Sequence, residues 1–286
     1  MRRLGRAVPV HQERRGDVAD TRAQGSVHLE LRQQIWIELT LHSGPNGSPH
    51  GGKQWCQTRI STEMPQISER AKSLGHVVMR AHNRRRFLAE LPTGAEVFDI
   101  GCGNDSPYLF KAIRPDIRYV GLDVADYGIA HDPNEYADQY LVVPPDQFLS
   151  TIQQRQGEFD AVVSSHNLEH CTEPDGVVTA MARALRPGGR IYLSFPAADT
   201  VNLPSREGTL NFFDDDTHVR PPDFRRVLGF LTAAGIDIDF AAERFRPLNW
   251  VLVGLVNEPL SRTRHKVMRG AWALYGFETV IWGTMS

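Results

Sequence analysis

The chain has few cysteines, and they form no recognisable pattern. Its 286 residues include three, Cys56, Cys102 and Cys171, an odd number without a CxxC pair. This spacing argues against a disulfide framework and against a cysteine-based zinc site. Since disulfides are rare in reducing compartments, we expect a cytoplasmic location.

Long apolar runs and an excess of one sign of charge are also missing. The longest apolar stretch, near 250–256, is interrupted by Gly254 and is far shorter than the roughly 20 residues of a membrane span. The 32 Lys and Arg nearly balance the 34 Asp and Glu, so no overall positive field would hold a nucleic acid. The arginine-rich start lacks the apolar core of a secretory signal. We therefore expect neither a membrane span nor a nucleic-acid partner.

The first 54 residues differ in pattern from the rest of the chain. Residues 27–41 alternate apolar and polar side chains, which is typical of a short hairpin, and SGPNGSPHGG (43–52) is typical of a flexible linker. We predict that residues 1–54 are a largely disordered tail and linker and that 55–286 form one domain. Apolar residues at helical spacing within 61–91 predict an amphipathic helix leading into that domain.

From residue 96 onward, short apolar strands alternate with helical segments. This alternation is typical of a parallel sheet covered by helices on both faces. Strands are expected at 96–100, 118–124, 138–143, 160–165, 190–195, 237–245 and 277–283, and helices at about 106–113, 147–156, 174–185, 221–234 and within 258–274. We predict an α/β protein with a doubly wound, Rossmann-like sheet of seven strands.

A glycine-rich turn, DIGCGN (99–104), follows the first expected strand. Gly101 and Gly103 let the backbone turn sharply and approach a ligand, and the next helix offers unpaired N–H groups to an anion. The second strand ends at Asp123, 24 residues after Asp99, where an acidic side chain can accept ribose hydroxyls. Ser106 replaces the third glycine of the dinucleotide fingerprint. The pattern favours a nucleoside-bearing cofactor over a dinucleotide.

The chain resembles the class I S-adenosylmethionine-dependent methyltransferases over roughly residues 70–286. The resemblance rests on EVFDIGCGN (96–104), VGLD (120–123), FDAVVSSHNLEH (159–170) and LRPGGRIYLSFP (185–196), in the family's order and spacing. It implies a sheet whose last strand is antiparallel. It also implies S-adenosyl-L-methionine as the cofactor.

The same resemblance implies roles for individual residues at the cofactor site. Asp99, Gly101 and Gly103 would surround the methionine end of the cofactor, Asp123 would accept the ribose hydroxyls, and Ser165 and His166 would line the methyl-transfer cleft. The third strand ends in VPPD (143–146) instead of the family's acidic adenine contact.

The segment HNLEH (166–170) also spells HxxEH, the motif of inverted zinc peptidases. That site needs both histidines on one long helix. Here a strand-like run precedes the motif, and Pro174 follows four residues after His170. We therefore expect no metal ion, a place for His166 in the catalytic cleft, and a structural role for His170.

A long polar loop with embedded aromatics, residues 197–222, follows the fifth expected strand. Such loops commonly form substrate lids. Its candidates are Arg206 as an anchor for an anionic group of the acceptor, Phe212 and Phe213 to exclude water, and His218 as the general base. The three aspartates at 214–216 are more typical of a turn or helix cap than of a metal site.

These features together predict methylation of a small-molecule or saccharide-like acceptor at oxygen or nitrogen. Three alternatives stay open. A non-catalytic cofactor-binding or scaffold protein with this fold would bind the cofactor without turnover. An NAD-dependent oxidoreductase would bind a nicotinamide cofactor. A zinc peptidase would bind zinc through the HxxEH motif.

Overall fold

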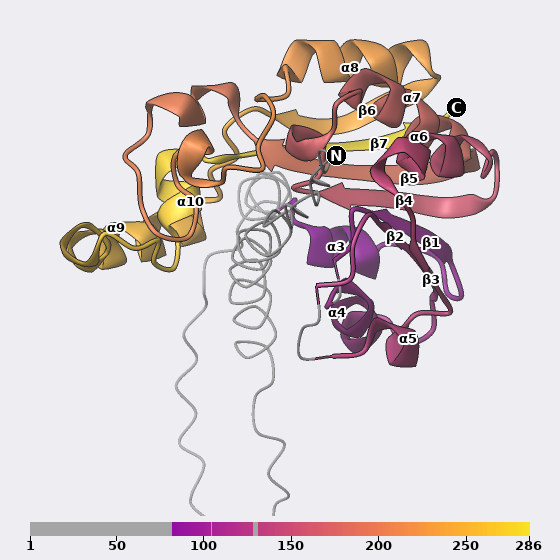
Figure 1. The fold of residues 1–286 in the computed structure, drawn as a ribbon, viewed down its shortest axis with the longest axis horizontal. Coiled ribbons are helices and arrows are strands. Elements are labelled where there is room, and N and C mark those ends of the chain that lie inside the picture. Colours follow the sequence, from indigo (N-terminus) through magenta and orange to yellow (C-terminus); the bar gives the residue numbers. More distant parts are fainter. Residues whose placement is uncertain (1–81, 104, 128–130) are drawn as a thin grey trace, which may run out of the picture.

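The computed structural model describes residues 82–103, 105–127 and 131–286 (Figure 1). The tail, linker and hairpin expected within 1–54 lie outside the described residues. So does most of the helix expected within 61–91, of which the structure describes α3 (Arg84–Ala89).

Seven strands of the described chain form one sheet in the order β3-β2-β1-β4-β5-β7-β6. They are β1 (Glu96–Ile100), β2 (Arg118–Asp123), β3 (Gln139–Val142), β4 (Phe159–Ser165), β5 (Leu185–Pro196), β6 (Ile236–Ala242) and β7 (Glu278–Met285). Neighbours among β1 to β5 pair in parallel, whereas β7 lies between β5 and β6 and is antiparallel to both. The expected seven-stranded sheet with a reversed last strand is confirmed.

Helices cover both faces of this sheet (Figure 1). Besides α3, the helices of the described chain are α4 (Ser106–Ile113), α5 (Pro133–Tyr136), α6 (Pro145–Gln153), α7 (Pro174–Ala184), α8 (Phe224–Ala233), α9 (Leu248–Arg264) and α10 (Ala271–Tyr275), with short 3₁₀ turns η1 (Leu168–His170), η2 (Ala198–Asn202) and η3 (Phe212–Asp214). Of these, α9 and α10 lie beside the sheet, on the left in Figure 1. None of these helices combines the length and apolar character that crossing a membrane requires.

Alternate residues of the central strands pack into two hydrophobic cores. Phe98 and Ile100 of β1 belong to the core under α6, α7 and α8. Val97, the residue before Phe98, packs on the other face of the sheet with Phe87 of α3 and Phe110 of α4. Successive side chains of a strand point to opposite faces, so the central strands read as continuous apolar runs because both faces are buried.

The element bounds differ from expectation mainly after β4. β5 begins at Leu185 rather than 190, because Leu185 pairs with Phe159 ahead of a register shift in β4. The helix expected within 258–274 is two helices, α9 and α10, and α9 begins earlier, at Leu248. The start of this helix contains a nearly continuous apolar run, residues 250–256 broken only by Gly254, and such a run does not mark where a helix begins.

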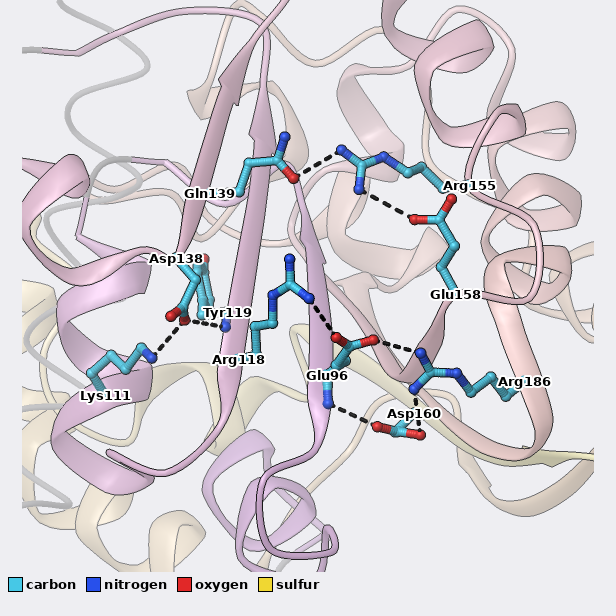
Figure 2. A network of polar contacts seen from close by, with 10 residues as sticks. All are labelled: Glu96, Lys111, Arg118, Tyr119, Asp138, Gln139, Arg155, Glu158, Asp160 and Arg186. Atoms are coloured by element: carbon cyan, nitrogen blue, oxygen red, sulfur yellow. Dashed lines mark hydrogen bonds and ion pairs between the residues drawn. The ribbon is translucent and has the colours of Figure 1, made fainter.

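Charged side chains tie the strands together at their amino ends (Figure 2). Arg186, at the start of β5, forms ion pairs with Glu96 of β1 and Asp160 of β4. Arg118, at the start of β2, also pairs with Glu96 at 2.7 Å. This network lies at the amino ends of the parallel strands. Open α/β sheets bind ligands at the opposite edge, where the carboxyl ends of the strands lie.

We expect Gly283 of β7 to be required for the sheet. A Cβ there would overlap the Ile236 Cγ2 methyl and lie 2.9 Å from the Asp237 carbonyl oxygen. Gly283→Ala therefore lowers the free energy of unfolding by about 1–3 kcal/mol, the usual cost of overpacking. Urea denaturation monitored by tryptophan fluorescence measures this loss.

The matched control is Gly229→Ala in the middle of α8, where an added Cβ meets nothing within 4 Å. Alanine at this helical position raises the free energy of unfolding by roughly 0.5–1 kcal/mol. Equal unfolding midpoints for the two variants would contradict the role assigned to Gly283.

Candidate functional site

The glycine-rich turn after β1 adopts a backbone that favours glycine. Gly101 and Gly103 have φ angles of 73° and 59°. A Cβ on Gly101 would lie only 2.5 Å from Cβ of Asn167, in the segment that follows β4. The turn after β1 and the HNLEH segment are therefore in close contact, as the carboxyl ends of neighbouring parallel strands allow.

Asp123, the last residue of β2, joins this turn through its buried carboxylate. Its Oδ2 accepts the Gly103 N–H at 2.7 Å, and its Oδ1 accepts the Val124 N–H at 2.7 Å and the Tyr127 hydroxyl at 2.9 Å. A carboxylate has about four acceptor positions. The structure thus brings Asp123 to Gly103, as expected for a shared cofactor site.

Asp99 precedes the turn and is fully enclosed, with 1% of its surface exposed. Its Oδ2 accepts the Tyr119 hydroxyl at 2.7 Å. Burial raises the pKa of its carboxyl to about 6. Ser165, also buried, ends β4, two residues beyond the β4 residue that pairs with Asp99. The five residues expected at the cofactor site therefore belong to one edge of three adjacent strands.

His166 is buried between two carboxylates. Its Nδ1 lies 3.2 Å from Glu169 Oε1 and its Nε2 lies 3.2 Å from Glu278 Oε1. Burial disfavours the charged ring, but the hydrogen bonds and charges of Glu169 and Glu278 outweigh this and raise its pKa to about 9. Both nitrogens of such a ring carry protons. The geometry therefore does not support His166 as a general base, because no lone pair is left to accept a proton.

His218 has the opposite character. Its side chain is 1% exposed, and burial lowers its pKa. Its Nδ1 lies 2.6 Å from the Phe212 carbonyl oxygen, which can only accept, so Nδ1 carries the proton. The Nε2 lone pair remains to accept a proton or bind a ligand.

The rest of the 197–222 loop is held by contacts within the chain. The Arg206 guanidinium is buried and forms a two-oxygen ion pair with Glu258 at 2.9 and 2.7 Å, with further hydrogen bonds to Ser261 and Tyr275. This guanidinium fastens the loop to α9 and α10, which lie on the left in Figure 1. In this structure a carboxylate of the same chain takes the position expected for an anionic acceptor group.

The two phenylalanines of the loop differ in their exposure to solvent. Phe212 is fully buried and its ring packs 4.5 Å from the His218 ring, whereas Phe213 is 72% exposed. Phe212 alone is therefore placed to keep water from His218.

Two acidic residues of the site were not among the expected ones. Glu278 begins β7, 112 residues after His166, and Asp215 follows η3. Asp215 stands in the run of three aspartates that we expected to form a turn or cap, and Glu278 has no local motif around it. Glu169 was considered only as part of a peptidase motif.

Comparisons with known proteins converge on one family. A family model described as a methyltransferase domain matches residues 77–238. The ubiquinone biosynthesis O-methyltransferase of Dechloromonas aromatica is 33% identical over 103 residues, which cover 35% of this chain and 44% of that protein. The 27-O-demethylrifamycin SV methyltransferase of Amycolatopsis mediterranei is 28% identical over 153 residues, which cover 49% and 51%.

A solved structure shares the fold. The S-adenosylmethionine-dependent methyltransferase from Mesorhizobium loti matches with a TM-score of 0.50 and 17% identity, over 70% of this chain and 96% of that one. The chain spans about half the length of the curated relatives it matches.

We expect the buried His166 ion pairs to make stability fall at alkaline pH. The pKa of His166 is raised from 6.5 to about 9 in the folded protein. Its stabilisation is therefore complete below about pH 6.5 and is lost as the pH rises through about 9. Urea denaturation between about pH 6 and 10 measures a decline of about 3 kcal/mol.

His166→Asn removes this decline and lowers stability below about pH 9, where the wild-type ring is charged, because Glu169 and Glu278 lose their cation. Asparagine tolerates the left-handed backbone of His166, at φ 52°. The control is His265→Asn, the same change at an exposed histidine with φ 49°, which keeps the wild-type profile. An alkaline decline that persists in His166→Asn would refute the assignment.

Proposed function

Because the chain belongs to the methyltransferase-domain family, we propose that it transfers a methyl group from S-adenosylmethionine to an oxygen of a small-molecule acceptor. The proposal assigns this activity to residues 55–286. The observation that carries it is the meeting of the Gly101–Gly103 turn with the Asp123 carboxylate at the carboxyl edge of the sheet. The relatives named for ubiquinone and rifamycin O-methylation support an oxygen acceptor on a small molecule.

The donor set of the site fits the ribose of such a cofactor. The described chain places three donors on Asp123: the Gly103 and Val124 N–H groups and the Tyr127 hydroxyl. Both N–H groups belong to the main chain and stay, whereas a hydroxyl on a side chain can turn away. Two acceptor positions then face the ribose diol, as a carboxylate with about four positions permits.

The residues around the turn after β1 would contact the methionine end of the cofactor. Asp99 and Ser165 present polar groups at the ends of β1 and β4, and glycine at 101 and 103 lets the backbone approach closely. When bound, the cofactor supplies a methyl group on a positively charged sulfur. The protein then has to align the acceptor oxygen with that methyl group and exclude water.

The acceptor hydroxyl must also lose its proton. Of the two histidines expected to take it, His218 retains a lone pair on Nε2 and His166 does not. Burial lowers the pKa of His218, which keeps its ring neutral at pH 7. We propose that the acceptor hydroxyl meets the protein beside His218, under the cover of Phe212.

The activity is tested by incubating the protein with S-adenosylmethionine and a panel of phenols, catechols and other hydroxylated small molecules. Mass spectrometry is expected to find a product heavier by one methyl group, together with S-adenosylhomocysteine. Calorimetric binding of S-adenosylhomocysteine without any product across the panel would instead support a non-catalytic cofactor-binding protein. Absence of binding would refute the cofactor assignment.

Asp123→Asn is expected to weaken S-adenosylhomocysteine binding by roughly 1.5–3 kcal/mol, or about 10- to 100-fold, because a charged acceptor of the ribose hydroxyls is lost. Isothermal titration calorimetry measures the difference. Glu158→Gln, an exposed carboxylate at the opposite edge of the sheet, serves as control and binds as the wild type does. Equal affinity of the Asp123 variant would remove Asp123 from the ribose site.

A further inference from the structure

Three side chains that cofactor binding does not use meet beside the acceptor region. One metal-binding atom from each of Glu169, His170 and His218 lies within 4.8 Å of the others. Glu169 and His170 come from η1, and His218 comes from the loop after η3. A main-chain hydrogen bond from the Val219 N–H to the Glu169 carbonyl, at 2.8 Å, fastens the loop to η1. The cluster is therefore built by two segments held in fixed register.

Hydrogen bonds set the tautomer of both histidines. His218 donates its Nδ1 proton to the Phe212 carbonyl at 2.6 Å. His170 Nδ1 lies 3.3 Å from the Thr217 carbonyl and 2.9 Å from the Thr217 hydroxyl, which itself donates to Asp215 Oδ1 at 2.6 Å. Nδ1 must therefore carry the proton in both rings, and in both neutral rings Nε2 carries a lone pair.

Buried acceptors in this cluster lack donors. Within the described chain Glu169 Oε2, Asp215 Oδ2 and His218 Nε2 are buried without a hydrogen-bond partner. The Glu169 side chain is 0% exposed, and those of Asp215 and His218 are each 1% exposed. Asp215 Oδ2 lies 3.9 Å from His218 Nε2. Buried hydrogen-bond acceptors without a donor are unfavourable and are rare in native proteins, so their presence here requires an explanation.

Three carboxylates lie in or beside the cluster. Those of Glu169 and Glu278 contact the His166 ring, and that of Asp215 lies 3.9 Å from His218 Nε2. A divalent cation held between Glu169, His170 and His218 would accept the lone pairs that have no donor.

We propose that Glu169, His170 and His218 bind a divalent transition-metal cation of the zinc type. Two imidazole nitrogens and one carboxylate oxygen are a ligand set that Zn²⁺ and its neighbours prefer over Mg²⁺ or Ca²⁺. Each ligand is oriented by a further hydrogen bond, from His166 to Glu169, from His170 to Thr217 and from His218 to Phe212. Such outer contacts are typical of metal-binding histidines and carboxylates.

This site differs from the zinc peptidase motif that HNLEH spells. His166 is not a ligand, because both of its nitrogens donate to carboxylates. The third ligand comes instead from the 197–222 loop. The proposal also replaces our expectation from the sequence that the segment holds no metal.

The cation site would change the role of His218 in methyl transfer, a step that rests on the proposed function. While Nε2 binds a cation, it cannot also accept the acceptor's proton. Three protein ligands leave a tetrahedral ion with an open position, and an oxygen bound there loses its proton more readily. The acceptor hydroxyl would then be activated by the cation rather than by the ring, and its proton would pass to solvent water.

Cation binding is tested without methyl donor or acceptor, so its failure is distinguishable from failure of the proposed function. The full chain is stripped with a chelator and titrated with ZnCl₂ or MgCl₂ by calorimetry. We expect one Zn²⁺ per chain, a raised melting temperature, and far weaker Mg²⁺ binding. No Zn²⁺ uptake by the wild-type chain would overturn the proposal.

The ligands are tested with Glu169→Gln and His218→Ala. We expect each to lower Zn²⁺ affinity by more than about 100-fold, the upper end of what the loss of an outer contact usually costs. His265→Asn and Glu207→Gln, both at exposed side chains, are the controls and retain wild-type affinity. Folded variants that bind Zn²⁺ as tightly as the wild type would refute the assigned ligands.

If the ligand variants do not fold, X-ray absorption at the zinc edge of the wild-type protein decides. Scattering from imidazole rings at about 2.0–2.1 Å supports the site, and a shell of sulfur or of oxygen alone contradicts it. In turnover assays, cation activation predicts loss with chelator and recovery with Zn²⁺. Turnover that is unchanged by the chelator would contradict activation by the cation and would support His218 as the general base.

Discussion

The ion pairs of His166 with Glu169 and Glu278 are the interaction on which the site depends. They join η1, which follows β4, to the start of β7, a segment 112 residues away. The ring has almost no contact with solvent, so removing one partner would leave a buried charge without compensation. The same ring fixes Oε1 of Glu169 and thereby leaves Oε2 for the cluster around His218.

The reversal of β7 makes this interaction possible. In the antiparallel pairing, Pro196 at the carboxyl end of β5 lies opposite Glu278 at the amino end of β7. A parallel strand in this place would have put its first residue at the other edge, among the ion pairs of Figure 2. The antiparallel strand instead delivers a carboxylate to the edge where β1, β2 and β4 end.

Features with a local pattern could be predicted from the sequence, and features made by distant segments could not. β1, β2 and the Gly101–Gly103 turn follow from apolar runs and glycine spacing, because each is specified by adjacent residues. The start of α9 was placed too late, because the nearly continuous apolar run at 250–256 has no helical period. The pairing of Arg206 with Glu258 and of His166 with Glu278 joins residues far apart in sequence, where one-dimensional periodicity carries no signal.

The segment HNLEH shows why a motif has to be interpreted through its backbone. On a helix its two histidines would share one face, whereas here His166 has a left-handed backbone and η1 begins only at Leu168. The five side chains therefore diverge: Asn167 contacts the Gly101 turn, Leu168 enters the core, and Glu169 and His170 turn toward the loop that carries His218. One short segment thus contacts the glycine turn, the sheet core and the 197–222 loop, although its five residues form no continuous helix.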